Sequence, residues 1–351
     1  MLNNNSNELN LSNQETQMPL DIILFGSILY SLIFLIGVFG NILVISVILI
    51  DKDLRNFTNY LLANLSVADL LLLFTNVPSG IHDLFAKERW YFGKIWCFLV
   101  SFIEHTTGFA SILSIFFITC DRYYVICRPL VVKSLMNQSR TLKLIAIIWL
   151  MSFLTNLPFI ALTSYSLAKF SNKQLEYKCA TRADQTWALY FIVTDSFIFY
   201  ILIGSVLIFM YYKIFKSLKV STKFLRLSSF SKSSKQKKQQ DRLLKLTKSE
   251  DEDKKVSFNP NINQSLMNKH VKQRQQLIIM LMIVLVTFYV CIFPLKIWNL
   301  LNLFAYRIDG FYQKIGFKLY WILNVTCRIF YYINSATNPI IFIEEPLNAR
   351  F

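Results

Sequence analysis

Seven long apolar stretches constrain this chain more than any other feature of its sequence. Each is long enough to cross the roughly 30 Å hydrocarbon core of a bilayer, which takes about 20 helical residues. Only helices and closed barrels satisfy every backbone polar group in lipid, and these stretches lack the two-residue alternation of barrel strands. The sequence therefore predicts an all-α membrane protein, a seven-transmembrane helical bundle. The stretches lie at 22–50, 57–79, 95–127, 141–163, 186–216, 275–304 and 317–343.

The distribution of charge predicts how this bundle is oriented. The segment from Lys213 to Arg274 carries 17 Lys or Arg against 5 Asp or Glu, whereas residues 1–21 carry three acids and no base. Because Lys and Arg mark cytoplasmic loops, the amino terminus is predicted outside and, after seven crossings, the carboxyl terminus inside. The net charge of +16 then belongs mainly to one inner loop, which suits membrane lipid and a cytosolic partner and not nucleic acid.

The crossings divide the chain into segments of different character. Residues 217–273 are rich in Lys, Ser, Gln and Asn and lack a sustained apolar pattern, so they are predicted to be largely disordered. Asn4 and Asn10 begin Asn-X-Ser triplets in the outer tail and are candidate glycosylation sites. The predicted segments are an extracellular tail (1–21), helices 1–5 (22–216), a basic cytoplasmic third inner loop (217–273), helices 6–7 (274–343) and a short cytoplasmic tail (344–351).

Two of the six cysteines are predicted to face an oxidising compartment. Cys97 falls at the outer end of the third helix, and Cys179 falls in the outer loop between the fourth and fifth helices. A disulfide between Cys97 and Cys179 is the expected pairing. The other cysteines lie in helices or near the cytosol, where reduced thiols are the default.

An acidic residue, Asp69, lies at membrane depth within the second apolar stretch. Ionisable groups there are costly and usually face a partner or a cavity. A carboxylate ringed by hydroxyl and amide oxygens suits a small hard cation such as Na⁺, whereas a hydrated polar network that holds the helices together is the alternative. No other cofactor is expected. The candidate sodium ligands are Asp69, Ser111, Asn334, Ser335 and Asn338.

Charged residues of both signs are also predicted at the outer ends of the helices. Glu104 lies two turns into the membrane after Cys97, and Asp195 lies at a similar depth in the fifth stretch. Lys296 and Arg328 can reach the same level from the sixth and seventh stretches. The four residues predict either a polar ligand site or a set of internal salt bridges.

Short motifs stand at regular places along the apolar stretches. Asp121–Tyr123 reads DRY at the inner end of the third stretch, and residues 338–342 read NPIIF in the last. In this combination and order, the motifs make the chain resemble a rhodopsin-like (class A) G-protein-coupled receptor across its transmembrane region. The other matching motifs are GN at 40–41, LANLSVADLL at 62–71, WYFG at 90–93, Cys97, PL at 129–130, Trp149 and CIFP at 291–294.

The resemblance implies a signalling function in the plasma membrane as a multi-pass protein. An extracellular ligand would favour an outward movement of the inner end of helix 6, which activates a heterotrimeric G protein, with arrestin and receptor kinases as further partners. The residues implied in G-protein coupling are Asp121, Arg122, Tyr123, Pro129, Leu130 and Tyr211. Those implied in the switch of helices 6 and 7 are Phe288, Pro294, Asn338 and Pro339.

Several positions depart from the family pattern. Ile292 stands where helix 6 usually carries a tryptophan, Ile203 where helix 5 carries a proline, and Phe342 where helix 7 carries a tyrosine. Arg274 stands where some relatives place an acid that clasps the arginine of the DRY motif. Raised activity without ligand is the expected consequence.

The ligand predicted for such a pocket is a peptide, and a neuropeptide in particular. A peptide offers groups of both signs to Glu104, Asp195, Lys296 and Arg328, and Tyr332 lies beside them. A biogenic amine is the alternative, although Lys296 would repel a small cation. A seven-helix transporter or channel is a remote alternative. An enzyme is not expected, because the three histidines are scattered and no nucleophile, base and orienting group come together.

Overall fold

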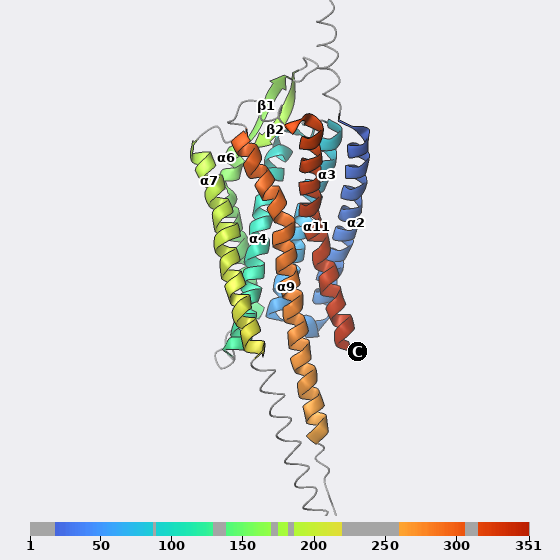
Figure 1. The fold of residues 1–351 in the computed structure, drawn as a ribbon, viewed down its shortest axis with the longest axis vertical. Helices are drawn as coiled ribbons and strands as arrows, with labels where there is room; N and C mark the ends of the chain where they lie inside the picture. The colour runs from blue at the N-terminus through green and yellow to red at the C-terminus, as the bar shows by residue number, and fades with distance from the viewer. Residues whose placement is uncertain are drawn as a thin grey trace, which may run out of the picture.

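Long helices run side by side along one axis, with a small hairpin of two strands at one end of the bundle (Figure 1). The structure, a computed structural model, describes residues 18–86, 89–128, 138–169, 175–181, 186–219, 260–305 and 315–350, and it describes no side chains at 169, 200, 260–274, 305 and 343–350. Asn4, Asn10, Pro129 and Leu130 lie outside the described residues. The long helices are α2 (Leu20–Ile50), α3 (Phe57–Ala86), α4 (Gly93–Cys127), α5 (Gln138–Asn156), α7 (Thr186–Ser196) with its continuation to Lys219, α9 (Pro260–Ala305) and α11 (Phe317–Arg350).

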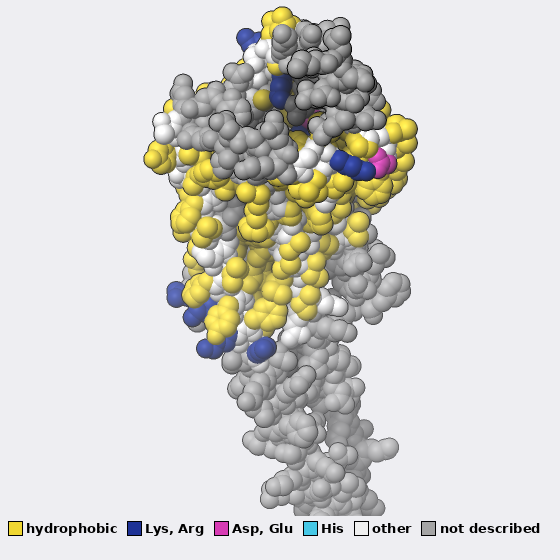
Figure 2. Space-filling view, turned by 45° about the horizontal axis from the view of Figure 1, so that its top comes forward, with side chains coloured by type: hydrophobic (Ala, Val, Ile, Leu, Met, Phe, Trp, Pro, Cys, Tyr) yellow, Lys and Arg dark blue, Asp and Glu magenta, His cyan; other side chains and the backbone are white. Residues whose placement is uncertain are grey.

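The seven-helix bundle predicted from the apolar stretches is confirmed. Among the described residues, six helical segments are long and apolar enough to cross a membrane, and α11 is not one of them. The seventh, α11, is less apolar because it turns Asn334, Ser335 and Asn338 into the bundle, where all three are buried. Side chains on the outside of the bundle are largely hydrophobic, as a surface in contact with lipid requires (Figure 2).

Helix ends differ from the predicted crossings where helices extend beyond the apolar stretches. The sequence predicts a loop up to residue 273, whereas α9 begins at Pro260. Similarly, α11 continues to Arg350 through the segment predicted as a tail, and α3 reaches Ala86 rather than residue 79. Hydropathy detects only the part of a helix that lipid surrounds, whereas helical hydrogen bonds continue through polar residues in water.

The connection between α5 and α7 contains an antiparallel hairpin that the apolar pattern does not predict. After a short helix α6 (Pro158–Leu162), β1 (Thr163–Lys169) pairs with β2 (Leu175–Thr181). The predicted disulfide joins Cys97 at the start of α4 to Cys179 in β2, with an S–S distance of 2.00 Å. The backbone N–H of Trp90 also donates to the carbonyl of Tyr177 at 2.8 Å. The hairpin is therefore fixed over the end of the bundle.

Polar and close-packed contacts hold the inner helices together. The indole N–H of Trp149 donates to Asn64 Oδ1 at 2.8 Å, and Asn64 Nδ2 donates to Ser114 Oγ at 2.9 Å, which ties α5, α3 and α4 together. A Cβ at Gly40 would lie 2.7 Å from Cβ of Pro339, so only glycine allows α2 to approach α11 this closely. The motif residues Gly40 and Trp149 thus have structural roles.

Candidate ligand pocket and coupling end

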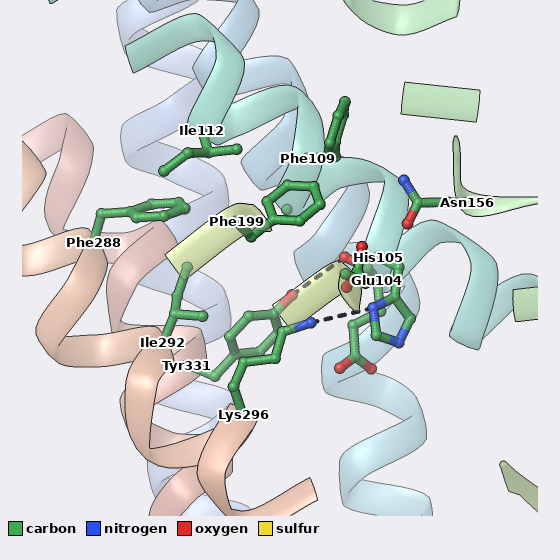
Figure 3. A pocket seen from close by; sticks show the side chains of 12 residues that line it. Glu104, His105, Phe109, Ile112, Asn156, Phe199, Phe288, Ile292, Lys296 and Tyr331 are labelled. Carbon is green, nitrogen blue, oxygen red and sulfur yellow. Dashed lines mark hydrogen bonds between the residues drawn. The ribbon is translucent and has the colours of Figure 1, made fainter. Parts of the chain in front are cut away.

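A cavity lies in the half of the bundle that carries the hairpin, and residues of α4, α5, α7, η3, α9 and α11 line it. η3 (Phe197–Ile203) is a π-helical turn that follows α7. Figure 3 shows acidic, basic and aromatic side chains converging on the cavity. Its lining residues are Glu104, His105, Gly108, Phe109, Ile112, Asn156, Asp195, Phe199, Phe288, Ile292, Lys296 and Tyr331.

One wall of the cavity is polar and carries charges of both signs. Lys296 Nζ of α9 lies 3.2 Å from His105 Nδ1 of α4 (Figure 3). An ammonium group has no lone pair, so Nδ1 accepts this hydrogen bond and the imidazole is neutral in this arrangement. The His105 ring stacks on Phe159, with ring centroids 3.5 Å apart, which fixes the orientation of the imidazole. His105 was not identified from the sequence.

The two acids of this wall have no ion pair within 4 Å among the residues that the structure describes. Glu104 lies close enough to Arg328 and Lys296 for electrostatic attraction, and Asp195 interacts in the same way with Lys296. The Tyr331 hydroxyl donates a hydrogen bond to the backbone carbonyl of Glu104 at 3.3 Å, and no described hydrogen bond from another helix reaches the Glu104 carboxylate. Both carboxylates therefore remain available to a ligand.

The deeper part of the cavity is apolar. Phe109 and Phe199 pack edge to face with ring centroids 4.3 Å apart, and Ile112, Phe288 and Ile292 complete this surface. Ile292 is the residue that replaces the family's tryptophan, so at this position the cavity has an aliphatic wall. A ligand that fits must combine polar groups with an apolar or aromatic portion.

Two of the five residues predicted to bind ligand lie beside the cavity and not among its lining residues. Arg328 pairs with Asp83 of α3, with 3.1 Å between the guanidinium nitrogen and the carboxylate oxygen. The Tyr332 hydroxyl donates to the carbonyl of Asn76 at 2.9 Å. Asp83 lies beyond the predicted second stretch, which ends at residue 79, whereas α3 continues to Ala86.

A further polar cluster fixes the hairpin to the first outer connection. Arg89 Nε lies 3.6 Å from Glu176 Oε1, and the Tyr91 hydroxyl donates to Glu176 Oε2 at 2.7 Å. This hydrogen bond to the carboxylate raises the pKa of Tyr91 above its ordinary value, because the neutral phenol is the form that donates. Arg89 and Glu176 are partly buried, whereas Tyr91 is exposed.

The Asp69 carboxylate is buried and held by α11. Ser335 Oγ donates to Asp69 Oδ1 at 2.7 Å, and Asn338 Nδ2 donates to Asp69 Oδ2 at 2.8 Å. Asn41 Nδ2 donates to the Ser335 carbonyl at 2.9 Å, which joins α2 to the cluster. The side-chain oxygens of Asn41, Asn334 and Asn338 are buried without a hydrogen-bond partner. Ser111 is buried on α4, but no described hydrogen bond joins it to Asp69.

At the opposite end of the bundle, the charged pair of the DRY motif is tied to α3. Arg122 lies 3.4 Å from Asp121 Oδ2, and Thr58 Oγ1 donates to the same carboxylate oxygen at 3.1 Å. The Arg122 guanidinium also donates to Thr58 Oγ1. Thr58 was not identified from the sequence, because its spacing from Asp121 and Arg122 in the chain gives no signal of this contact.

The remaining residues predicted for coupling or switching occupy different parts of the bundle. Tyr211 is buried, with its hydroxyl 3.4 Å from Thr119 Oγ1, and Tyr123 is partly buried against the core. Phe288 lines the cavity, and Pro294 lies within α9. The side chain of Arg274 lies outside the described part of the chain.

A bundle of seven helices with a disulfide-anchored hairpin, a cavity beneath it and an Asp-Arg pair at the other end is the architecture of a seven-transmembrane receptor. The chain belongs to the rhodopsin family of these receptors, because the family described as 7 transmembrane receptor (rhodopsin family) matches residues 40–342. It is a G-protein-coupled receptor and a multi-pass protein of the plasma membrane, and not an enzyme.

Its relatives are neuropeptide receptors. Neuromedin-U receptor 2 of Mus musculus is 27% identical over 334 residues, which cover 94% of this chain and 74% of that protein. The Thyrotropin-releasing hormone receptor of Homo sapiens is 24% identical over 319 residues, 90% of this chain and 74% of that protein. The Pyrokinin-1 receptor of Drosophila melanogaster is 34% identical over 140 residues, 40% of this chain and 33% of that protein.

Proposed function

We propose that this receptor binds an extracellular peptide in the cavity beneath the hairpin and activates a heterotrimeric G protein at the opposite end. The observation that carries the proposal is the mixed charge of the cavity, where Glu104, Asp195 and Lys296 lie above an apolar floor. A peptide supplies both charged groups and apolar side chains. Relatives named as receptors for neuromedin U, thyrotropin-releasing hormone and pyrokinin support a neuropeptide.

The proposed orientation places the hairpin outside the cell. Exposed Lys and Arg gather at the end opposite the hairpin, and basic loops mark the cytoplasmic side (Figure 2). A disulfide in the hairpin also suits an oxidising exterior. The exposed basic residues of that opposite end include Lys52, Arg55, Arg128, Arg140, Lys143, Lys213 and Lys216.

The charges of the cavity favour a peptide that carries a cationic group. Two acids face one lysine with a neutral His105 beside it, and Asp83 neutralises Arg328, so one negative charge remains among these residues. A small amine would have to approach Glu104 past Lys296, whose ammonium group repels it. A longer peptide can place its cation against the acids and its backbone carbonyls against Lys296.

Coupling is proposed to run through α4 and α9, which both line the cavity. A ligand that binds one conformation better shifts the population toward it, and an outward movement of the inner part of α9 would free Arg122 to contact the G protein. Pro294 interrupts the hydrogen-bond ladder of α9 and gives this movement a pivot. Arrestin, receptor kinases and lipid on the basic inner surface are proposed as further partners.

A library of peptides and amines, applied to cells that express the chain, tests this function through nucleotide exchange on G proteins. Cationic peptides should activate, and versions with every Lys and Arg replaced by Gln should not. Cells that express Arg122→Gln at matched surface levels are the control. Activation by amines alone would overturn the peptide assignment, and absence of any response together with solute uptake in reconstituted vesicles would indicate transport.

We also propose a sodium ion at Asp69. The carboxylate and the unpartnered side-chain oxygens of Asn334 and Asn338 form an oxygen-rich, buried set that suits a small hard cation. The ion would hold α3 and α11 together. Raising NaCl against choline chloride should increase the melting temperature of the purified receptor and have no such effect in Asp69→Asn. An equal response of both proteins would contradict the site.

A further inference from the structure

The wall of the cavity formed by Phe199 is wound differently from the rest of its helix. Residues Phe197–Ile203 form the π-helical turn η3, in which hydrogen bonds run from residue i to residue i+5. Such turns are rare and frequently occur at functional sites. Ile203 occupies the position where a proline was expected, and no proline occurs anywhere in residues 186–216. A proline is therefore not the cause of the altered winding, and the contacts around η3 are relevant to it.

Tyr289 of α9 contacts this turn at Phe199, within it, and at Gly204, just after it. Its hydroxyl donates to the carbonyl of Phe199 at 3.4 Å. Its ring lies over Gly204, the residue that follows η3, so that a Cβ at Gly204 would lie 3.0 Å from the hydroxyl oxygen and 3.2 Å from Cε1 and Cζ. A Cβ at position 204 would require the tyrosine ring to shift by a few tenths of an ångström. The absence of a Cβ at Gly204 lets the Tyr289 ring lie against the end of η3, and the Tyr289 hydroxyl binds the Phe199 carbonyl.

The same tyrosine is connected to the cavity from two sides. Phe199, whose carbonyl it binds, packs on Phe109 and lines the cavity. Phe288, its neighbour in α9, also lines the cavity and packs against the Tyr289 ring with centroids 5.6 Å apart. A displacement of Phe199 by a ligand would therefore act on α9 through Tyr289.

We propose that Tyr289 is a positioning residue for the ligand pocket, holding η3 in its π-helical winding so that Phe199 faces the cavity. The link joins the cavity wall to the helix whose movement would signal, and this second part rests on the proposed function. Tyr289 lies on the inner side of Pro294, in the part of α9 that the proposed movement displaces. Occupancy of the cavity and the position of α9 are then coupled by one side chain.

Hydrogen–deuterium exchange on the purified receptor without ligand tests the structural part. Tyr289→Phe removes the hydroxyl, and Gly204→Ala places a Cβ where the Tyr289 ring lies. Tyr190→Phe is the matched control, because Tyr190 of α7 is 69% exposed. Uptake in peptides that span 197–206 should rise about threefold or more in the first two variants, as the loss of one weak hydrogen bond predicts, and stay unchanged in the control. Unchanged uptake there, or an equal rise in α2, would overturn the proposal.

The most active peptide of the library tests the functional part. Its half-maximal concentration should rise about tenfold in Tyr289→Phe and in Phe199→Ala, and the double variant should lose no more than the worse single variant, because both act through one side chain. Additive losses would contradict positioning through Phe199. If no peptide activates the wild-type receptor, the proposed function fails. The hydrogen–deuterium exchange experiment still tests whether Tyr289 holds η3 in its π-helical winding.

Discussion

The two ends of the bundle hold their charged side chains in different ways. At the end opposite the hairpin, Asp121 and Arg122 are joined to each other and to Thr58 by direct contacts. In the cavity, Glu104 and Asp195 have no described ion pair within 4 Å. The cavity acids have basic residues nearby but no direct ion pair, so a ligand that supplies a cation at contact distance should be attracted there, whereas Asp121 and Arg122 already contact each other. The open carboxylates of the cavity suit ligand binding, and the joined side chains of the opposite end suit restraint.

The largest effect is expected from Arg122→Ala at the satisfied end. The substitution removes the guanidinium that is proposed to contact the G protein in the active state, so ligand-stimulated nucleotide exchange should fall about 100-fold, equivalent to about 2.7 kcal/mol. The measurement is exchange on purified G protein, at receptor amounts matched by surface labelling. Arg128→Ala, at an exposed arginine just after α4, is the control and should retain exchange. Equal retention in Arg122→Ala would contradict a coupling role.

The next largest effect is expected from releasing the β1–β2 hairpin that lies over the cavity. Cys97→Ser breaks the bond to Cys179 and frees the hairpin, and loss of a disulfide costs about 2–4 kcal/mol. The purified variant should melt at a lower temperature and bind its peptide more weakly. Cys327→Ser, at a cysteine outside the disulfide, is the control. If both variants melt like the wild type, the hairpin does not depend on the bond.

Glu104→Gln tests whether the Glu104 carboxylate binds a cationic group of the ligand. The substitution keeps the shape and removes the charge, so the half-maximal concentration of a cationic peptide should rise about tenfold, equivalent to about 1.4 kcal/mol. A Gln-substituted peptide should be affected less. Asp21→Asn, at an exposed acid at the start of α2 and outside the cavity, is the control. An unchanged dose response at equal surface expression counts against Glu104 as a contact.

The smallest effect is expected from Thr58→Ala, which removes one contact from the restrained end. Arg122 and Asp121 keep their own ion pair, so ligand-free activity should rise only about twofold to threefold, or roughly 0.5 kcal/mol, the lower end for a single hydrogen bond. Second-messenger levels in ligand-free cells provide the measurement. Thr155→Ala is the control, because Thr155 bonds only within α5. Lower activity than the wild type would show that Thr58 supports the active state.

Much of the candidate site follows from the sequence because its motifs have fixed places on the helices. Cys97 and Cys179 are paired as predicted, and Glu104, Asp195 and Lys296 lie together on the cavity. His105, Asp83 and Thr58 could not be found in this way. Each becomes relevant through a contact with another helix, and a single sequence does not specify how helices rotate against one another.

The sequence by itself determined the number of crossings and the membrane setting, because the cost of exposing polar backbone to lipid leaves helices as the only fit for seven apolar stretches. Only the tertiary structure decided which charges are satisfied. Packing brings Asp83 to Arg328 and Thr58 to Arg122, while Glu104 and Asp195 are left open. The physical reason is that electrostatic attraction depends on distances of a few ångströms between helices, which hydropathy does not encode.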